Sequence, residues 1–252
     1  MAALVLRGEE LGTVEAVLFD KDGTLSHSEP ELRALANTRL QRCLESVVPP
    51  LRQTLRQRLN EAYGLLETGV HPAGITAVAA RDHNLLATAT ALAQVGLGWP
   101  EALRISEEVF ASCDRADHAA SATTDGAVDT LLRLTSAGIR CAVISNDSVA
   151  GINRFLSDHA LVDRVSAIWS AEHTPRKPHP AAVHGLCAEL GIPVSRCALI
   201  GDANSDLQMA VDAGIPHHLA LGYTAGWGQA PPLGDHHPLI HSWSDLTVRS
   251  GT

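Results

Sequence analysis

The sequence contains very little lysine. Two lysines, Lys21 and Lys177, stand against 17 arginines in a chain of 252 residues. Lysine carries a compact point charge and arginine a planar fork, so the two side chains are not interchangeable at a binding site. We therefore treat both lysine positions as candidates for a specific role.

Long apolar runs are also lacking, and none reaches the length of a transmembrane helix. The opening residues MAALVLRGEELG lack the basic leader and long apolar region of a signal peptide. Five cysteines, at positions 43, 113, 141, 187 and 197, show neither metal-site nor redox spacing, which fits a reducing compartment. We expect a soluble, cytoplasmic protein without a membrane partner.

An excess of positive charge is absent as well. The net charge of -9 argues against a nucleic-acid partner, and the hydrophobic content of 45% is sufficient for a packed core. The histidines include two adjacent pairs, His217-His218 and His236-His237. Neither pair has the i, i+4 spacing of a helical metal site, so we interpret both as structural or solvated.

Short apolar runs that end in polar or small residues predict strands buried on both faces. They cover residues 16–19, 141–144, 165–169 and 197–200. Between them, helical periodicity leads up to Gly138, Gly191 and Gly214, which are typical helix ends. Alternating strands and helices predict an α/β fold with a doubly wound parallel sheet. In the Gly-, Pro- and His-rich end of the chain we expect a short strand near residues 239–240 and a helical turn over 244–248.

Residues 26–124 interrupt this alternation with helical patterns alone. Ser28 and Glu31 read as a capping pair at the start of a helix, and further helices are expected over about residues 50–66, 73–95 and 99–113. Small and polar residues at 24–27 and 119–126 suit hinges. We therefore predict a core domain of residues 1–25 and 125–252 with an inserted helical cap domain of residues 26–124.

In a doubly wound sheet, ligands bind outside the carboxyl ends of the strands. Clustered carboxylates at this rim require a cation, and oxygen ligands without cysteine or histidine favour Mg²⁺. A hydroxyl, an ammonium and a helix N-terminus would form a cradle for a phosphoryl group. One aspartate could attack phosphorus, and a second could protonate the leaving oxygen. The residues concerned are Asp20, Asp22, Ser145, Asn146, Lys177, Asp202 and Asp206.

The segments FDKDGTL, VISND, RKPHP and GDANSD, in this order, resemble the four signature motifs of the haloacid dehalogenase superfamily. The helical insertion resembles the C1-type cap of phosphoglycolate phosphatase-like members. The resemblance implies catalytic roles for Asp20 as nucleophile, Asp22 as general acid and base, and Lys177. It also implies phosphate binding by Thr24, Ser145, Asn146 and Lys177, and Mg²⁺ binding by Asp20, Asp22, Asp202 and Asp206, with Asp22 acting through its backbone carbonyl.

Simpler interpretations exist for several of these residues. Asp20 and Asp22 could form a strand-end turn, Ser145-Asn146-Asp147 could cap a helix, and Asp206 could be an acid favoured by a helix dipole. Lys21 departs from the resemblance, because C1-capped members of the superfamily more often have an apolar residue at this position. In an extended segment its side chain would point away from its neighbours, so we expect Lys21 to pair with neither Asp20 nor Asp22, and the distant Lys177 to offset their charge.

An aspartate at position 22 favours a phosphatase or a phosphomutase over a dehalogenase, because a halide leaves without a proton. The cap contains no lysine for the Schiff base of a phosphonate hydrolase. We therefore expect a Mg²⁺-dependent phosphomonoester hydrolase acting on a small cytosolic phosphate ester, with phosphoglycolate as the first candidate. A phosphomutase of the β-phosphoglucomutase type and a non-catalytic binding protein remain alternatives. Arg33, Arg81 and His83 are candidates for substrate selection in the cap, and the pattern predicts no oligomeric state.

Overall fold

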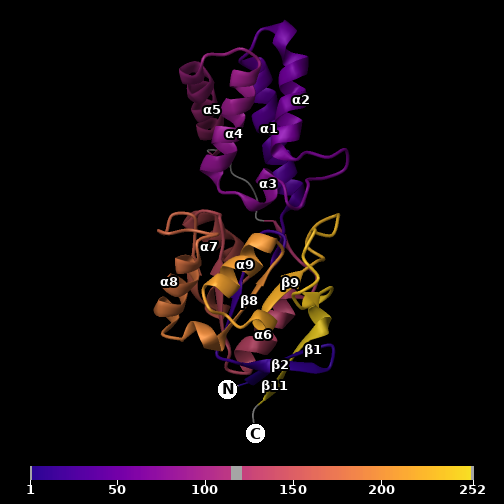
Figure 1. Cartoon of the computed structure of the whole chain (residues 1–252), viewed down its shortest axis with the longest axis vertical. Coiled ribbons are helices and arrows are strands. Elements are labelled where there is room, and N and C mark those ends of the chain that lie inside the picture. Colours follow the sequence, from indigo (N-terminus) through magenta and orange to yellow (C-terminus); the bar gives the residue numbers. More distant parts are fainter. Residues whose placement is uncertain (1, 115–120, 251–252) are drawn as a thin grey trace. The chain divides into compact units, whose positions relative to one another are not determined.

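The computed structural model describes residues 2–114 and 121–250 (Figure 1). It divides the chain into two compact units: Met1–Ser28 joined to Ala120–Thr252, and Glu29–Ala119. We call them the α/β unit and the helical unit. Part of the expected return hinge, at residues 119 and 120, lies outside the described residues. The assignment of the two units to a catalytic core and a substrate-selecting cap stays a prediction.

The α/β unit is built on a six-stranded parallel sheet with the order β10-β9-β8-β3-β6-β7. All four residues of the central strand β3 are buried, as expected for a strand covered on both faces. The four predicted strands and the short strand near residue 239 are confirmed. The strands are β3 (Ala16–Phe19), β6 (Arg140–Ile144), β7 (Val165–Trp169), β8 (Cys197–Gly201), β9 (Ala220–Tyr223) and β10 (Leu239–Ile240).

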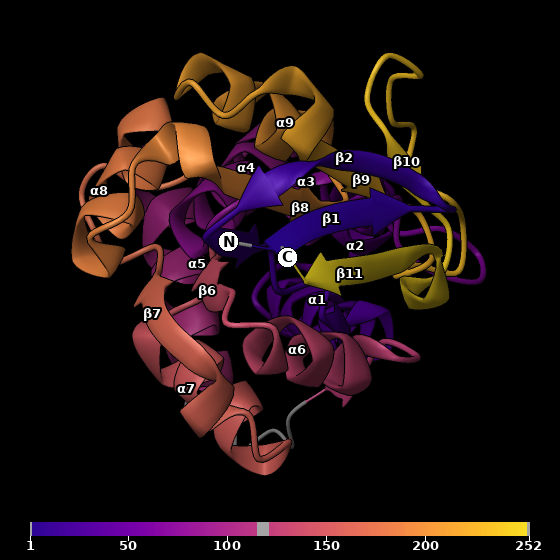
Figure 2. The ribbon, with the colours of Figure 1, turned by 90° about the horizontal axis from the view of Figure 1, so that it is seen from below.

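Helices cover both faces of this sheet. Figure 2 shows α8 and α9 on one side of the strands and α6 and α7 on the other. The predicted doubly wound α/β fold is therefore confirmed. The helices are α6 (Ala127–Ser136), α7 (Val149–Asp158), α8 (Pro180–Leu190) and α9 (Asn204–Asp212), with short 3-10 turns η2 (Val162–Arg164), η3 (Val194–Arg196) and η4 (His217–Leu219).

Two further sheets were not predicted. β1 (Ala2–Leu6) pairs antiparallel with β2 (Glu9–Val14) and with β11 (Leu246–Ser250). The expected helical turn over 244–248 is wrong, because a 3-10 turn, η5 (Trp243–Asp245), leads directly into β11. The partner of β11 lies at the other end of the chain, so local periodicity could not reveal it. β4 (Ser26–His27) and β5 (Ala122–Thr123) form a short ribbon within the stretch expected to be helical.

The helical unit has a hydrophobic core of its own, which includes Leu40, Leu59, Leu92 and Phe110. The expected helix over 73–95 is two helices, separated at Ala79 and Ala80, whose backbones are extended. The Asn84 amide donates to the carbonyl oxygens of both alanines at 3.2 Å, which stabilises the break. The elements are α1 (Glu29–Glu45), η1 (Pro49–Leu51), α2 (Arg52–Tyr63), α3 (Ile75–Val78), α4 (Arg81–Gln94) and α5 (Trp99–Asp114).

Candidate active site

The site forms where three neighbouring strands of the α/β unit end. Phe19 of β3 lies opposite Val143 of β6 and Ile200 of β8, and all three strands run parallel. The Asp20 amide continues this pairing and donates to the Ile200 carbonyl at 2.9 Å. The residues that follow these strands therefore meet at one rim, where a doubly wound sheet places its ligands.

Lys177 connects this rim to the loop before α8. Its ammonium lies 2.7 Å from Asp20 Oδ1 and 2.8 Å from Asp206 Oδ1. It also lies 3.4 Å from the carbonyl of Ile144, the last residue of β6. The expected pairing of Lys177 with Asp20 is present, and the lysine holds together segments that are distant in sequence.

Three aspartates lie close together at the rim beside Lys177. Ligand oxygens of Asp20, Asp202 and Asp206 lie within 4.8 Å of one another, and all three residues are buried. With all of them ionised, Lys177 leaves an excess of two negative charges. Carboxylate oxygens and this excess fit a hard divalent cation such as Mg²⁺. Asp206 also accepts from the Ala203 amide at the start of α9 at 3.4 Å, so it belongs to both the helix start and the cluster.

Burial controls the protonation of this cluster. It raises the pKa of Asp20 to about 6, against the opposing effect of Lys177 and with the help of Asp206. Burial likewise raises the pKa of Asp202, and the nearness of Asp20 and Asp206 raises it further. Burial alone would lower the pKa of Lys177, but Asp20 and Asp206 outweigh it and raise the pKa. The lysine is therefore charged, and the carboxylates are the groups that a bound cation would ionise.

Two hydrogen bonds orient the Asp202 carboxylate. The Thr24 hydroxyl donates to Oδ1 at 2.9 Å, and the Trp227 indole donates to Oδ2 at 2.6 Å. The hydroxyl of Thr24, expected to contact phosphate, is thus directed at a carboxylate. Sequence reasoning missed Trp227, which lies in the irregular segment after β9. Its isolation between Gly226 and Gly228 was the only local signal.

Close backbone packing surrounds this tryptophan. A β-carbon at Gly23 would overlap the indole nitrogen of Trp227, and one at Gly226 would overlap the Gly23 carbonyl. Gly23 also has a φ of 78°, in the left-handed region that favours glycine. Glycine at these two positions lets the segment after β9 approach the turn that follows Asp22.

The carboxylate of Asp22 has different partners. Lys21 Nζ lies 2.6 Å from Asp22 Oδ1 and 3.0 Å from Asp147 Oδ2, and the Ser28 hydroxyl also donates to Asp22. The expectation that Lys21 pairs with neither neighbour is wrong for Asp22. β3 ends at Phe19, so strand alternation no longer applies at residue 21, and the flexible stem folds back. Ser28, expected as a helix cap, directly precedes α1, and its hydroxyl donates to Asp22.

Burial alone would lower the pKa of Lys21, but Asp22 and Asp147 outweigh it and raise the pKa, so this lysine is charged. Both lysines of the chain are therefore buried ammonium groups, each between two carboxylates. The two lysine positions, singled out because lysine is scarce in the sequence, thus both lie in specific buried environments.

Ser145 and Asn146 follow β6 directly, and Ser145 is buried. The Ser145 hydroxyl oxygen accepts from the Asp147 amide at 3.1 Å. The cap of α7 is Ser148, which accepts from the Gly151 amide, so the expectation that Ser145-Asn146-Asp147 caps this helix is wrong. The segment turns once more before the helix begins, which places Ser145 at the rim beside the Ile144 carbonyl that contacts Lys177.

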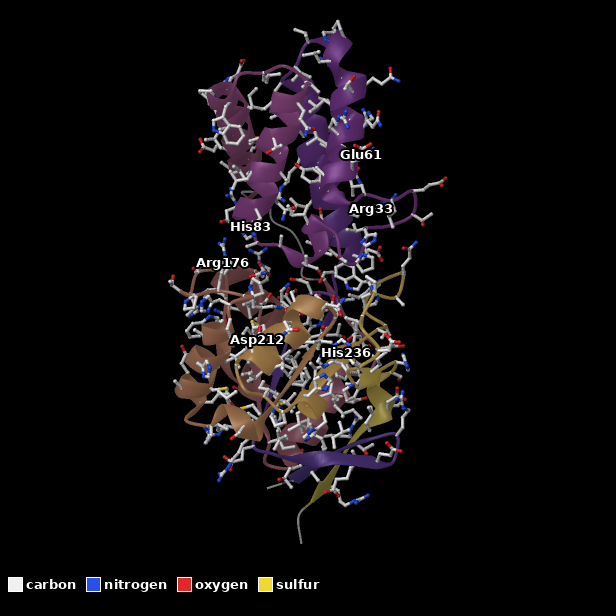
Figure 3. All side chains as sticks on the ribbon, in the orientation of Figure 1. Arg33, Glu61, His83, Arg176, Asp212 and His236 are labelled. Atoms are coloured by element: carbon white, nitrogen blue, oxygen red, sulfur yellow. The ribbon has the colours of Figure 1, made fainter. Side chains whose placement is uncertain are left out.

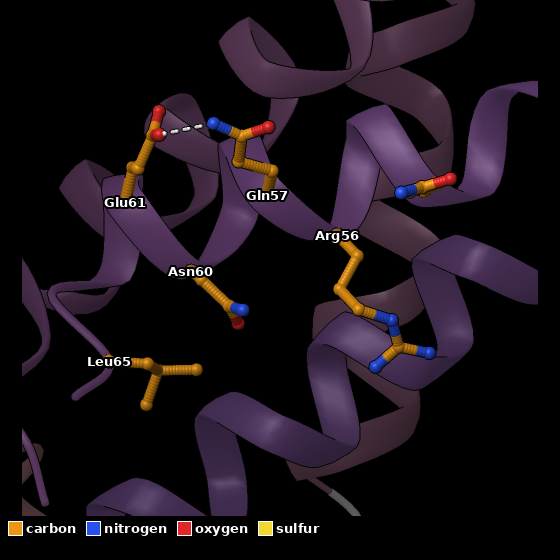
Figure 4. A pocket seen from close by; sticks show the side chains of 6 residues that line it. Arg56, Gln57, Asn60, Glu61 and Leu65 are labelled. Carbon is orange, nitrogen blue, oxygen red and sulfur yellow. Dashed lines mark hydrogen bonds between the residues drawn. The ribbon is translucent and has the colours of Figure 1, made fainter. Parts of the chain in front are cut away.

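Two of the three candidate residues of the helical unit, Arg33 and Arg81, have contacts within that unit, and Figure 3 labels Arg33 and His83 on it. Arg33 donates to the Glu67 carbonyl at 2.6 Å, and the Arg81 guanidinium lies 5.3 Å from the centre of the Phe110 ring. A pocket of about 360 Å³ on α2 includes Arg56, Gln57 and Glu61 in its lining (Figure 4). Gln57 and Glu61 bond to each other there, and the pocket does not include Arg33, Arg81 or His83.

The family follows from a comparison with known proteins. The family model "haloacid dehalogenase-like hydrolase" matches residues 14–214, and the chain belongs to this family. The match spans all four motifs named above, so the predicted superfamily is confirmed, and the protein is an enzyme of the hydrolase class. Among the described residues, no helix is long and apolar enough to cross a membrane.

Particular relatives are phosphoglycolate phosphatases. The one from Pectobacterium atrosepticum is 24% identical over 249 residues, which cover 94% of this chain and 92% of the relative. The one from Rhodospirillum rubrum is 29% identical over 210 residues, covering 80% and 77%. A crystal structure of a predicted phosphoglycolate phosphatase from Haemophilus somnus matches with a TM-score of 0.68 at 20% identity, covering 92% of this chain and 96% of that one. This structural likeness shows a shared fold.

Proposed function

We propose that the chain is a Mg²⁺-dependent phosphomonoester hydrolase that forms an aspartyl phosphate on Asp20. The observation that carries this proposal is the contact of Lys177 with both Asp20 and Asp206 in a buried cluster of three carboxylates. An ammonium beside a nucleophilic carboxylate can also bind the phosphoryl oxygens and stabilise the charge that develops on them. The relatives named as phosphatases support the same chemistry.

Asp20 and Asp22 divide the reaction between them. The Asp20 carboxylate attacks phosphorus, the ester P–O bond breaks, and Asp22 gives its proton to the leaving oxygen. Asp22 then takes a proton from water, whose oxygen attacks the phosphorus of the aspartyl phosphate. The bond between phosphorus and the Asp20 oxygen breaks, which frees the Asp20 carboxylate and releases inorganic phosphate. Lys21 and Ser28 contact the Asp22 carboxylate, whereas Lys177 pairs with Asp20, so the two aspartates have different partners for their separate tasks.

The remaining site residues bind and orient. Asp20, Asp202 and Asp206, with the backbone carbonyl of Asp22, would hold Mg²⁺, which supplies positive charge to the phosphoryl group when bound. Thr24 positions Asp202 through its hydroxyl. Ser145 and Asn146, at the rim after β6, bind the phosphoryl oxygens.

The first test replaces the nucleophile. Asp20→Asn should lower kcat on phosphoglycolate at least about a thousandfold while the protein stays folded, because the amide cannot form the phosphorylated intermediate. Asp212→Asn is the matched control, since Asp212 is exposed on α9 and bonds only to Gln208 among the contacts described (Figure 3). Turnover by Asp20→Asn equal to that of the wild type would refute the nucleophile.

The same assay addresses substrate and metal. We propose phosphoglycolate as the first substrate to measure, alongside sugar phosphates and nucleotides, ranked by kcat/KM. Chelation should abolish turnover, and Mg²⁺ should restore it. Release of inorganic phosphate indicates a phosphatase, whereas transfer between two positions of a sugar phosphate would indicate a phosphomutase. No turnover of any phosphate ester in the panel would favour a non-catalytic binding protein.

A further inference from the structure

Three histidines that the proposed reaction does not use come together in the α/β unit. His217 begins η4, and His236 and His237 end the segment between β9 and β10. One ring nitrogen of each lies within 4.8 Å of those of the other two. The ring centre of His237 lies 4.2 Å from that of His217 and 4.4 Å from that of His236. Two histidine pairs that looked unrelated in sequence thus contribute to one cluster.

Burial distinguishes the three rings. His237 is 6% exposed, and its Nδ1 has no hydrogen-bond partner among the residues that the structure describes. His217 and His236 are exposed, and Figure 3 labels His236 on the α/β unit. A buried imidazole whose Nδ1 lacks a hydrogen-bond partner has a lone pair or a proton left unsatisfied, and a metal ion bound through this nitrogen would satisfy it.

We propose that His217, His236 and His237 bind a divalent transition-metal ion, with Zn²⁺ as the representative. Imidazole nitrogens suit Zn²⁺, Ni²⁺ or Cu²⁺, whereas Mg²⁺ prefers oxygen ligands. The α/β unit therefore holds two cation sites of different chemistry: a carboxylate cluster at the rim, and a histidine cluster at the end of the segment after β9. Three protein ligands leave one tetrahedral position to water.

The geometry requires a small rearrangement. Zn–N bonds of about 2.0–2.1 Å place tetrahedral ligand nitrogens about 3.3 Å apart. The ring nitrogens now lie within 4.8 Å of one another, so they approach by up to about 1.5 Å on binding. The rings of His217 and His237 are nearly parallel, at 12°, and at least one must turn before both lone pairs point at one ion. The side chains of His217 and His236 are exposed to solvent, so they can turn, while buried His237 is the fixed ligand.

A metal ion bound by the three histidines would link the C-terminal end of the segment 224–238 to η4. Trp227 of this segment donates to Asp202, and the Gly234 amide donates to Asn204 Oδ1 at 2.9 Å. The Asn204 amide in turn donates to the Pro232 carbonyl at 2.7 Å. An ion that joins η4 to residues 236 and 237 would restrain the segment at the end opposite to Trp227. Because only the folded chain brings the three ligands together, binding stabilises the fold by mass action.

The test uses the full chain without a histidine tag, after chelation and dialysis, in excess Mg²⁺ so that the carboxylate cluster is saturated. Calorimetric titration with Zn²⁺ should show one equivalent bound at micromolar or lower concentration. His217→Ala and His236→Ala should each weaken binding at least about tenfold, and both are exposed, so the fold should persist. His218→Ala is the control, because its ring faces Gly12 of β2, with Nε2 3.7 Å from the β-carbon position there.

A second readout reports the ligands directly. Co²⁺ in place of Zn²⁺ should give the visible absorption of a nitrogen-ligated, four-coordinate ion in the wild type and in His218→Ala. Hydrogen exchange in residues 224–238 should slow when Zn²⁺ is added. The proposal is overturned if micromolar Zn²⁺ does not bind, or if the double variant His217→Ala/His236→Ala binds it as tightly as the wild type.

Discussion

At the scale of single residues, the chain uses its two lysines in the same way. Lys177 lies between Asp20 and Asp206, and Lys21 lies between Asp22 and Asp147, in every case at 3.0 Å or less. A compact ammonium with three donors fits between two carboxylates at this distance, whereas the planar fork of arginine is wider. Asp20 and Asp22, only two residues apart, therefore have different lysine partners and different environments.

Lys21→Met tests the second of these pairs. It removes the partner of Asp22 and Asp147, whose side chains are 20% and 33% exposed, and should lower the free energy of unfolding by about 1–3 kcal/mol. The kcat should fall roughly 10–100-fold with a smaller change in KM, because the Asp22 carboxylate loses a donor that orients it. Lys21→Arg keeps the charge and should lose less. An unchanged kcat in Lys21→Met would contradict this role.

The raised pKa of Asp20 predicts a pH dependence of stability. In the metal-free protein the pKa is about 6 when folded, against 3.8 for the ordinary group, so the unfolded chain releases this proton first. The contribution of Asp20 to stability is therefore full below about pH 4 and is lost as the pH rises to about 6. Asp20→Asn lacks this titration and should be more stable than the wild type at pH 7.5 in a chelator, with a smaller difference at pH 5.

Denaturant unfolding at both pH values, with chelator and with Mg²⁺, measures this effect. Mg²⁺ should stabilise the wild type at pH 7.5 more than at pH 5, because protons compete for the same carboxylates. The prediction fails if the wild type and Asp20→Asn show the same dependence on pH in the chelator.

At the scale of elements, the irregular segment after β9 is part of the site. Two residues donate to the two oxygens of Asp202. Thr24 precedes Asp202 in sequence and lies in the turn after β3, whereas Trp227 follows it and lies in the segment 224–238. Partners of a metal-binding carboxylate fix its direction, and their loss weakens metal binding even when the ligands remain. A segment with neither helix nor strand periodicity thus carries a positioning residue.

Trp227→Phe should therefore raise the Mg²⁺ concentration for half-maximal activity by roughly tenfold, while kcat at saturating Mg²⁺ changes little. Phenylalanine keeps a buried ring but has no N–H donor for Asp202. Trp99→Phe is the matched control, because Trp99 is 48% exposed and lies in the helical unit. Equal Mg²⁺ dependence in Trp227→Phe and the wild type would show that the indole has only a packing role.

At the scale of the whole molecule, the residues that the structure describes form two hydrophobic cores, one in each compact unit. The larger surrounds the parallel sheet, and the smaller lies among α1, α2, α4 and α5. Because each unit buries its own apolar surface, we expect them to differ in stability and to respond separately to substitutions.

Phe110→Ala tests this separation. Phe110 is fully buried in the helical unit, so the change should cost that unit about 3–5 kcal/mol. Calorimetry should show one transition shifted to lower temperature, and another that keeps its midpoint and its response to Mg²⁺. If both transitions shift together, the two units unfold as one cooperative body.

The prediction from sequence succeeded where the pattern is local. A polar residue directly follows each of the four predicted strands of the parallel sheet, and the motifs place Asp20, Ser145 and Asp202 at such positions. It failed where the partner is distant. The strand β11 pairs with β1 from the other end of the chain, so the expected helical turn at 244–248 was wrong. The break at Ala79 escaped prediction for another reason: its partner Asn84 is near in sequence, but the bond depends on where the side-chain amide points.

The sequence by itself determined the family, the α/β alternation and the chemical types at the rim, because periodicity and motif order are properties of neighbouring residues. Only the tertiary structure decided which charges meet: Lys21 with Asp22 and Asp147, and Trp227 with Asp202. It also decided that His217 lies beside His236 and His237. These contacts depend on how a turn or an irregular segment folds back over the sheet, and the energy of a buried charge or imidazole depends on distances that sequence spacing does not specify.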